Sequence, residues 1–214
     1  MKTILAFGDS LTFGMDAATV TRHAYEDRWP SVLEAGLEGR ARVIAEGLGG
    51  RTTAFDDFTA AADRNGARLL PSILTTHNPL DVVIIMLGVN DLKPSVCGKA
   101  NAIAAGMRRL VQIVQSHPYD VGGTVPAIVV VSPPHCGPTD APDGQPAMDR
   151  SIDESRKLSA LYAAIAKESG AAFFDAATVS QPCRVDGVHL DAANTRAIGL
   201  GLVPVLKTVL GFDR

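Results

Sequence analysis

The chain has 214 residues, of which 46% are hydrophobic and 20% are charged, and its formal net charge is −3. This length suits one domain with a substantial core, and the lack of a basic stripe argues against a nucleic-acid-binding protein. The longest aliphatic run that we find, 82–87, is too short to span a membrane. The amino-terminal apolar segment meets Gly8 and Asp9 too early for a secretory signal. We therefore expect one globular domain, residues 1–214, in the cytoplasm.

Cysteine and histidine spacings argue against a disulfide framework and against a metal site. Three cysteines, an odd number at unrelated positions, favour reduced thiols: Cys97, Cys136 and Cys183. Four histidines lack the spacing of metal ligands: His23, His77, His117 and His135. We expect neither a metal nor a cofactor.

Short apolar runs alternate with stripes of apolar side chains at helical spacing. The runs predict five strands, at residues 4–7, 41–45, 82–87, 128–131 and 171–174. The stripes predict helices within residues 29–37, 103–114, 158–165 and 198–209, and Pro204 should kink or interrupt the last. Strand–helix alternation predicts an α/β protein, a three-layer αβα sandwich with a parallel sheet and right-handed crossovers.

Two long connections stand out in this pattern. Residues 14–27 follow the first strand, and residues 133–150 follow the fourth and contain five prolines. Long connections in a compact domain are commonly functional or mobile, and they are also places where surface insertions accumulate. We leave both interpretations open.

Polar residues and glycines follow four of the predicted strands. In an open parallel sheet, ligands bind where the strands end in their carboxyl-terminal direction. Ser10 follows the first strand, Gly50 lies in the turn after the second, and Asn90 follows the third. Asp186 and His189 come after the fifth strand, before the last predicted helix. We expect these residues to meet at one rim of the sheet.

This set of residue types is the one that acyl transfer requires. A serine hydroxyl needs an imidazole base within hydrogen-bond reach, and the imidazole needs a carboxylate to fix its tautomer. Ser10, His189 and Asp186 can fill those roles. The tetrahedral oxyanion needs preorganised donors, which the backbone amides of Ser10 and Gly50 and the side chain of Asn90 can supply.

Each of these residues also has a purely structural interpretation. Ser10 could cap the turn that follows the first strand. Gly49 and Gly50 could supply positive φ angles, and Asn90 could belong to an ordinary loop with local hydrogen bonds. The arrival of all of them at one predicted rim favours the catalytic interpretation.

Four sequence blocks resemble those of the SGNH (GDSL) hydrolase superfamily. They are Gly8-Asp9-Ser10-Leu11, Gly50, Gly88-Val89-Asn90-Asp91 and Asp186-Gly187-Val188-His189. The stretches Asp27-Arg28-Trp29, Arg51-Thr52-Thr53 and Val131-Ser132-Pro133-Pro134 are similar to the bacterial arylesterase and acyltransferase branch. The blocks occur in consistent order over nearly the whole chain, which makes the signal specific.

This resemblance implies a flavodoxin-like five-stranded parallel sheet and an esterase without a metal. It implies Ser10 as nucleophile, His189 as base and Asp186 as the residue that orients His189, with Gly50 and Asn90 in the oxyanion hole. Asp175, which follows the fifth strand, is an alternative to Asp186, but the short Asp186-to-His189 spacing matches the family block. The resemblance also implies a homo-oligomer.

The resulting prediction is a serine esterase that acts on small aryl esters, with alcohol or peroxide as further acyl acceptors. A carbohydrate acetylesterase or a thioesterase with the same triad is an alternative. A different class, a flavodoxin-like phosphate- or flavin-binding protein, would explain the Gly8-to-Thr12 turn but not Asn90 or the Asp186/His189 pair. We expect a small-molecule ester as the partner, and no nucleic acid or membrane.

Overall fold

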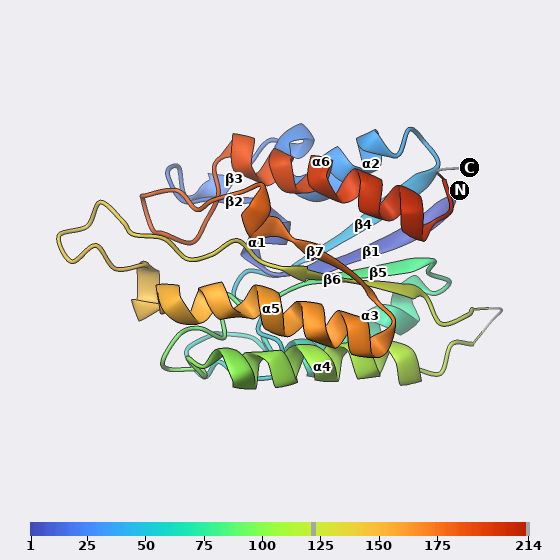
Figure 1. Cartoon of the computed structure of the whole chain (residues 1–214), viewed down its shortest axis with the longest axis horizontal. Coiled ribbons are helices and arrows are strands. Elements are labelled where there is room, and N and C mark those ends of the chain that lie inside the picture. Colours follow the sequence, from blue (N-terminus) through green and yellow to red (C-terminus); the bar gives the residue numbers. More distant parts are fainter. Residues whose placement is uncertain (121–122, 213–214) are drawn as a thin grey trace.

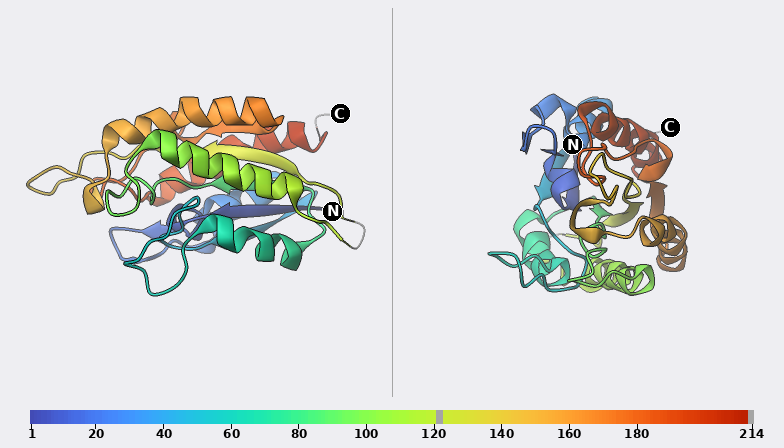
Figure 2. Two further views of the ribbon diagram at one scale, coloured as in Figure 1. Left: turned by 90° about the horizontal axis from the view of Figure 1, so that it is seen from below. Right: turned by 90° about the vertical axis from the view of Figure 1, so that its left-hand side faces the viewer.

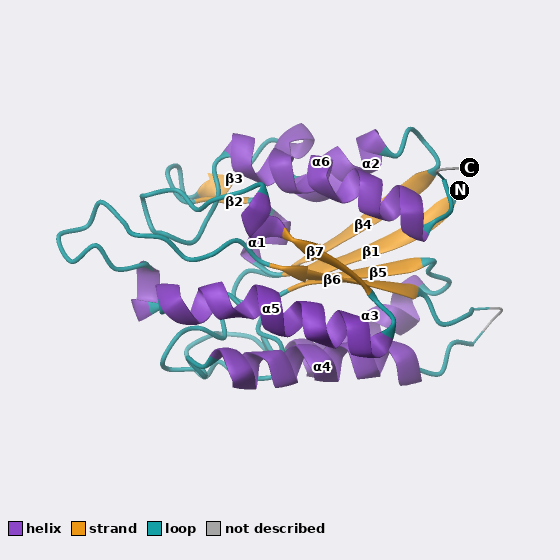
Figure 3. Cartoon of the chain, viewed as in Figure 1, coloured by secondary structure: helices purple, strands orange, loops and turns teal. Residues whose placement is uncertain are grey.

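A five-stranded parallel sheet forms the centre of the molecule in the computed structural model, which describes residues 1–120 and 123–212 (Figure 3). Its strands are β1 (Lys2–Gly8), β4 (Ala41–Gly47), β5 (Val82–Met86), β6 (Ala127–Ser132) and β7 (Ala172–Asp175). They lie in the order β4-β1-β5-β6-β7, and every neighbouring pair is parallel. This is the flavodoxin-like order, so the predicted fold class and all five predicted strands are confirmed.

Helices cover both faces of the sheet and complete the three layers (Figures 1 and 2). Helices α2 (Trp29–Gly36) and α6 (Ala192–Val209) pack on one face. Helices α3 (Gly66–His77), α4 (Ala100–Ser116) and α5 (Ile152–Ser169) cover the other. Within the described ranges, no helix is long and apolar enough to cross a lipid bilayer.

Shorter elements lie in the connections between the strands and the long helices. They are α1 (Ser10–Phe13), η1 (Tyr25–Asp27), η2 (Ala147–Asp149), η3 (Ala176–Thr178) and a hairpin of β2 (Met15–Asp16) and β3 (Thr21–Arg22). The hairpin and η1 occupy the connection at residues 14–27, so this segment has local structure that its sequence did not indicate.

The apolar patterns explain why the layers form. Strand β5 is buried along its whole length, as its continuous aliphatic sequence predicts for a central strand covered on both faces. Trp29 of α2 and Tyr162 of α5 are the largest fully buried side chains, and they come from opposite layers. The Tyr162 hydroxyl donates to the Leu87 carbonyl at 3.0 Å, which satisfies its polar group within the core.

Two helices differ from the sequence prediction. Helix α3 was not predicted, because Gly66 and Pro71 are poor helix formers and obscure the buried pair Leu70 and Leu74. Of the two effects expected of Pro204, a kink or an interruption, the interruption does not occur, because helix α6 continues through this residue. The carbonyl that Pro204 leaves without a helical partner belongs to Leu200, which is exposed and can bond water instead.

Gly47, the last residue of β4, allows α1 to lie close against the sheet. A Cβ atom at this position would lie only 2.6 Å from the backbone Cα of Phe13. Helix α1 begins at Ser10, so any displacement of α1 moves the serine that the sequence singles out. The close approach of these two backbone segments therefore ties the sheet to the candidate nucleophile.

We expect Gly47→Ala to lower stability by about 2 kcal/mol, because the added methyl group meets backbone that cannot rotate away. For a chain of this size, that corresponds to a melting temperature lower by roughly 4–8 °C. Gly49→Ala is the matched control, since a Cβ there has no atom within 4 Å. Equal melting temperatures of the two variants, measured by calorimetry, would contradict this account of the close approach.

Candidate active site

Ser10, His189 and Asp186 form a continuous chain of hydrogen bonds at the carboxyl-terminal edge of the sheet. Ser10 is the first residue of α1, immediately after β1, and the other two lie between η3 and α6. The distance from Ser10 Oγ to His189 Nε2 is 2.8 Å, and that from His189 Nδ1 to Asp186 Oδ2 is 2.5 Å. The structure thus brings together the three residues that the sequence places in a triad.

The Asp186 carboxylate is fixed by more than its bond to the imidazole. Its Oδ1 accepts the backbone N–H groups of Val188 at 3.0 Å and of His189 at 2.9 Å. Burial acts to raise the pKa of Asp186, but the hydrogen bonds from the His189 side chain and from both backbone amides outweigh it and lower the pKa to about 2. Asp186 is therefore ionised at neutral pH and directed at the imidazole.

Asp175, the sequence-based alternative, has other partners. Its Oδ2 accepts the Ser159 hydroxyl at 2.6 Å, and its Oδ1 accepts the backbone N–H of Ala177 at 3.0 Å. Asp175 thereby caps η3 and links it to α5. Both of its oxygens are engaged away from His189.

Asp9, and not Ser10, caps α1. The Asp9 Oδ1 atom accepts the backbone N–H of Leu11 at 2.9 Å, so the structural interpretation of Ser10 as a capping residue is wrong. Its carboxyl is fully buried, which raises the pKa of Asp9 to about 6, although the hydrogen bond from Leu11 and the nearby cations act in the opposite direction. With Asp9 in the cap, the Ser10 hydroxyl is left to bond His189.

Asn90 links the segments that carry the other two candidate oxyanion donors. Its Nδ2 donates to the Arg51 carbonyl at 3.1 Å and to Asp9 Oδ2 at 3.3 Å. Arg51 follows Gly50, and Asp9 precedes Ser10, so the carboxamide bonds a residue adjacent to each of the two backbone donors. Its Oδ1 accepts a hydrogen bond from Arg150 at 2.9 Å, a contact that no pattern in the sequence indicates.

Arg51 braces the turn that contains Gly50. Gly50 has a φ of +83°, which favours glycine, whereas Gly49 does not have a positive φ. Arg51 Nη1 donates to the Gly8 carbonyl at 2.8 Å and also to that of Glu46, and its guanidinium lies 4.1 Å from the centre of the Phe7 ring. These contacts attach the turn to β1 and β4, and so to the strand that leads into Ser10.

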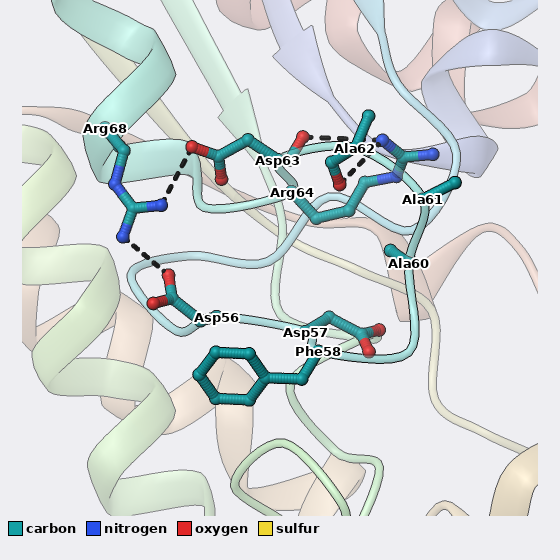
Figure 4. Close-up of a pocket in the computed structure, with 9 residues that line it drawn as sticks. All are labelled: Asp56, Asp57, Phe58, Ala60, Ala61, Ala62, Asp63, Arg64 and Arg68. Carbon is teal, nitrogen blue, oxygen red and sulfur yellow. Dashed lines mark hydrogen bonds and ion pairs between the residues drawn. The ribbon is translucent and has the colours of Figure 1, made fainter.

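A hollow formed largely by the segment that precedes α3 borders this turn. Figure 4 shows Arg68 reaching Asp63 and Asp56, at 2.9 and 2.8 Å. Arg64 donates to backbone carbonyls of its own loop, and its Nε would lie 3.3 Å from a Cβ on Gly50. The hollow is therefore lined by these charged side chains together with Phe58 and the alanines at 60–62, and Arg64 brings its edge close to Gly50. Among the described residues, no group of histidine, cysteine and acidic side chains could hold a metal ion.

Comparisons with known proteins identify the family of this chain. Residues 6–196 match the model of the GDSL-like lipase/acylhydrolase family. The chain belongs to this family. It is therefore an SGNH-type esterase, and the expected resemblance to that superfamily is confirmed, which leaves no support for a flavin- or phosphate-binding protein.

Three solved structures are similar to this esterase over almost its entire length. A carbohydrate acetylesterase family member from Sinorhizobium meliloti is 48% identical, with a TM-score of 0.94 and coverage of 99% of this chain and 100% of that one. A candidate arylesterase from Agrobacterium tumefaciens is 53% identical, with a TM-score of 0.94 and coverage of 98% and 100%. The aryl esterase of M. smegmatis is 40% identical, with a TM-score of 0.88 and coverage of 98% and 100%. No curated protein sequence matches.

The pair Asp186 and Asp175 allows a matched test of which carboxylate orients His189. We expect Asp186→Asn to lower kcat by about 10³- to 10⁴-fold, because an amide at this position favours the wrong imidazole tautomer. Asp175→Asn should leave kcat within about twofold, since its partners lie outside the triad. Steady-state kinetics on an aryl acetate measure both, and the reverse order of losses would contradict the assignment.

The buried carboxyl groups of Asp9 and Asp91 make the stability of the fold depend on pH. Both are fully buried, and burial raises the pKa of each to about 6 from an ordinary 3.8, although Thr53 donates to Asp91 and acts in the opposite direction. A carboxyl with a raised folded-state pKa stabilises the fold below the unfolded pKa, and this contribution is lost as the pH rises through about 6.

We therefore expect Asp91→Asn to remove part of the pH dependence of folding. The free energy of unfolding of the parent protein, measured with urea, should fall more between about pH 5 and about pH 8 than that of the variant. Comparison with the parent cancels the titration of residues common to both proteins. Parallel changes in the two proteins would refute a raised pKa of Asp91.

Proposed function

We propose that this esterase hydrolyses small carboxylic esters, aryl acetates among them, through an acyl-enzyme on Ser10. The observation that carries the proposal is the unbroken hydrogen-bond chain from Ser10 Oγ through His189 to the ionised Asp186. Activation of a serine hydroxyl requires a base within hydrogen-bond distance and a third group that orients the base. Both requirements are met by side chains of the family's sequence blocks.

Acylation follows from these positions. Ser10 Oγ attacks the ester carbonyl carbon while its proton passes to His189 Nε2, and Asp186 stabilises the imidazolium through Nδ1. The carbonyl oxygen becomes an oxyanion, which the backbone amides of Ser10 and Gly50 and the Asn90 Nδ2 would stabilise. Collapse of the tetrahedral intermediate expels the alcohol or phenol, which takes the proton from His189.

Deacylation repeats the chemistry with a second nucleophile. A water molecule loses a proton to His189 and attacks the acyl carbon. The Ser10 oxygen then leaves as a hydroxyl, because His189 returns the proton to it. An alcohol or a peroxide in place of water would give acyl transfer or a peracid. Phenols are good leaving groups that need little protonation, so aryl acetates are suitable assay substrates.

A carbohydrate acetate is the second candidate substrate. Similarity at 48% identity to the carbohydrate acetylesterase family member from S. meliloti favours it. The hollow beside Gly50, with Arg64 at its edge, contains acidic and basic side chains that would serve as hydrogen-bond partners for a hydroxylated substrate. The ratio of kcat/KM on phenyl acetate, an acetylated sugar and an acyl-CoA thioester distinguishes the three substrate classes.

Labelling with a fluorophosphonate probe tests the nucleophile. We expect a single adduct on the peptide that contains Ser10, and a loss of kcat of roughly 10⁴-fold or more in Ser10→Ala. Ser159→Ala is a suitable control, because this serine bonds Asp175 outside the triad and should leave activity near that of the parent. An adduct on another serine, or full activity of Ser10→Ala, would overturn the proposal.

A further inference from the structure

Arg150 is a buried arginine whose hydrogen bonds converge on the loop that carries Asn90. Its side chain lies at the end of the long 133–150 connection, and the residue is only 5% exposed. Nη2 donates to Asn90 Oδ1 at 2.9 Å, Nε donates to the Val89 carbonyl at 2.9 Å, and Nη1 donates to the Ala147 carbonyl at 2.5 Å. One planar group thus holds both the backbone before Asn90 and its side chain.

These contacts allow only one orientation of the Asn90 carboxamide. A guanidinium has donors and no acceptor, so the atom that faces Arg150 has to be the amide oxygen. The other end of the amide faces the Arg51 carbonyl and the Asp9 carboxyl, which serve as acceptors. A rotation of the amide by 180° would place its N–H donors against those of Arg150, and its oxygen against the acceptors of Arg51 and Asp9. Arg150 therefore directs Nδ2 toward the Arg51 carbonyl and the Asp9 carboxyl, which belong to the residues next to Gly50 and Ser10.

The buried guanidinium of Arg150 forms no ion pair with the described residues. Among the described residues, no carboxylate lies within ion-pair distance of Arg150, and Asp9 and Asp186 act on it only at longer range. A buried charge without a close counter-ion costs stability unless its hydrogen bonds are satisfied. The three acceptors of Arg150 satisfy it in part, and one of them is the carboxamide of the candidate oxyanion hole.

The backbone before Arg150 is also strained. Met148 and Asp149 have φ angles of +58° and +54°, in the left-handed region that residues with a side chain seldom adopt. Strain of this kind is retained where surrounding contacts require it, and it concentrates at functional sites. Arg150 follows directly, one residue before Ser151, which caps α5. The end of the connection is therefore held between a strained turn and a packed helix.

We propose that Arg150 is the positioning residue of the oxyanion hole, and that it acts through Asn90. It fixes the rotation of the carboxamide and, as a cationic donor to Oδ1, polarises the amide so that Nδ2–H becomes a stronger donor. The contact of Nδ2 with Asp9 Oδ2, at 3.3 Å, is at the long end of hydrogen-bond distances. The Nδ2 hydrogen that faces Asp9 is therefore the one available to an oxyanion. This inference rests on the proposed esterase mechanism.

A double-mutant cycle on an aryl acetate tests this role. We expect Arg150→Met to lower kcat by roughly 10- to 100-fold, since a misplaced donor costs that much. KM should stay within about twofold, because the oxyanion exists only in the transition state. In an Asn90→Ala background, Arg150→Met should lower kcat by less than about twofold further, because the group through which it acts is absent.

Arg184→Gln is the control variant that loosens the 133–150 connection without touching Asn90. Arg184 Nε bonds Asp140 Oδ1 at 2.6 Å and ties the same connection to the turn before Asp186, so this variant should keep kcat close to that of the parent. Melting curves verify that each variant folds. If Arg150→Met does not fold, Arg150→Lys replaces it, because lysine keeps the charge and removes the planar fork. We expect the loss of kcat in Arg150→Lys to disappear in the Asn90→Ala background, as for Arg150→Met.

The same fold loss of kcat with and without the Asn90 side chain, or an unchanged kcat in Arg150→Met, would overturn the proposal. A failure of the underlying mechanism would look different. In that case the parent protein would be inactive on esters, or Ser10→Ala would retain activity in the same assay series.

Discussion

The hydrogen bond between Ser10 and His189 joins residues 179 positions apart, and the rest of the site serves to hold it. Ser10 is fixed by its place at the start of α1, which lies against Gly47 of the neighbouring strand. His189 is fixed by Asp186, whose carboxylate accepts the imidazole and two backbone amides. Because the two ends of this bond come from opposite ends of the chain, the site exists only when the sheet is complete.

Buried charge surrounds that bond and links the site to stability. Asp9, Asp91, Arg51 and Arg150 are all almost fully buried at the edge of the sheet. Buried charges tend to destabilise a fold, and proteins retain them where they hold a functional geometry. In this protein, each of these four side chains forms a hydrogen bond to a segment that carries a candidate catalytic group, or lies next to such a group. The positions of the oxyanion donors thus depend on interactions that an apolar core would not contain.

Much of this arrangement follows from the sequence alone. The strands can be predicted because each is a short apolar run, and the rim can be predicted because parallel strands all end at the same edge. The expected positions of Ser10, Asn90, Asp186 and His189 follow from where these strands end. Their geometry agrees with that expectation, while their catalytic roles stay predictions.

Other features could not be predicted because their causes are tertiary. Helix α3 contains a proline and begins with a glycine, and its stability comes from packing and not from propensity. Pro204 is accommodated in α6 where the affected residue faces solvent. Arg150 lies in a connection without periodicity, and only the folded chain shows that it meets a carboxamide 60 positions earlier.

Rapid-quench peptide mapping during turnover of an aryl acetate tests the central claim most directly. The account predicts that an acetyl group appears on the peptide containing Ser10 within the first turnover and disappears when the ester is consumed. It also predicts that the acetyl group does not form in Ser10→Ala. Release of the phenol at full rate with no acetyl group on Ser10 at any time would contradict it.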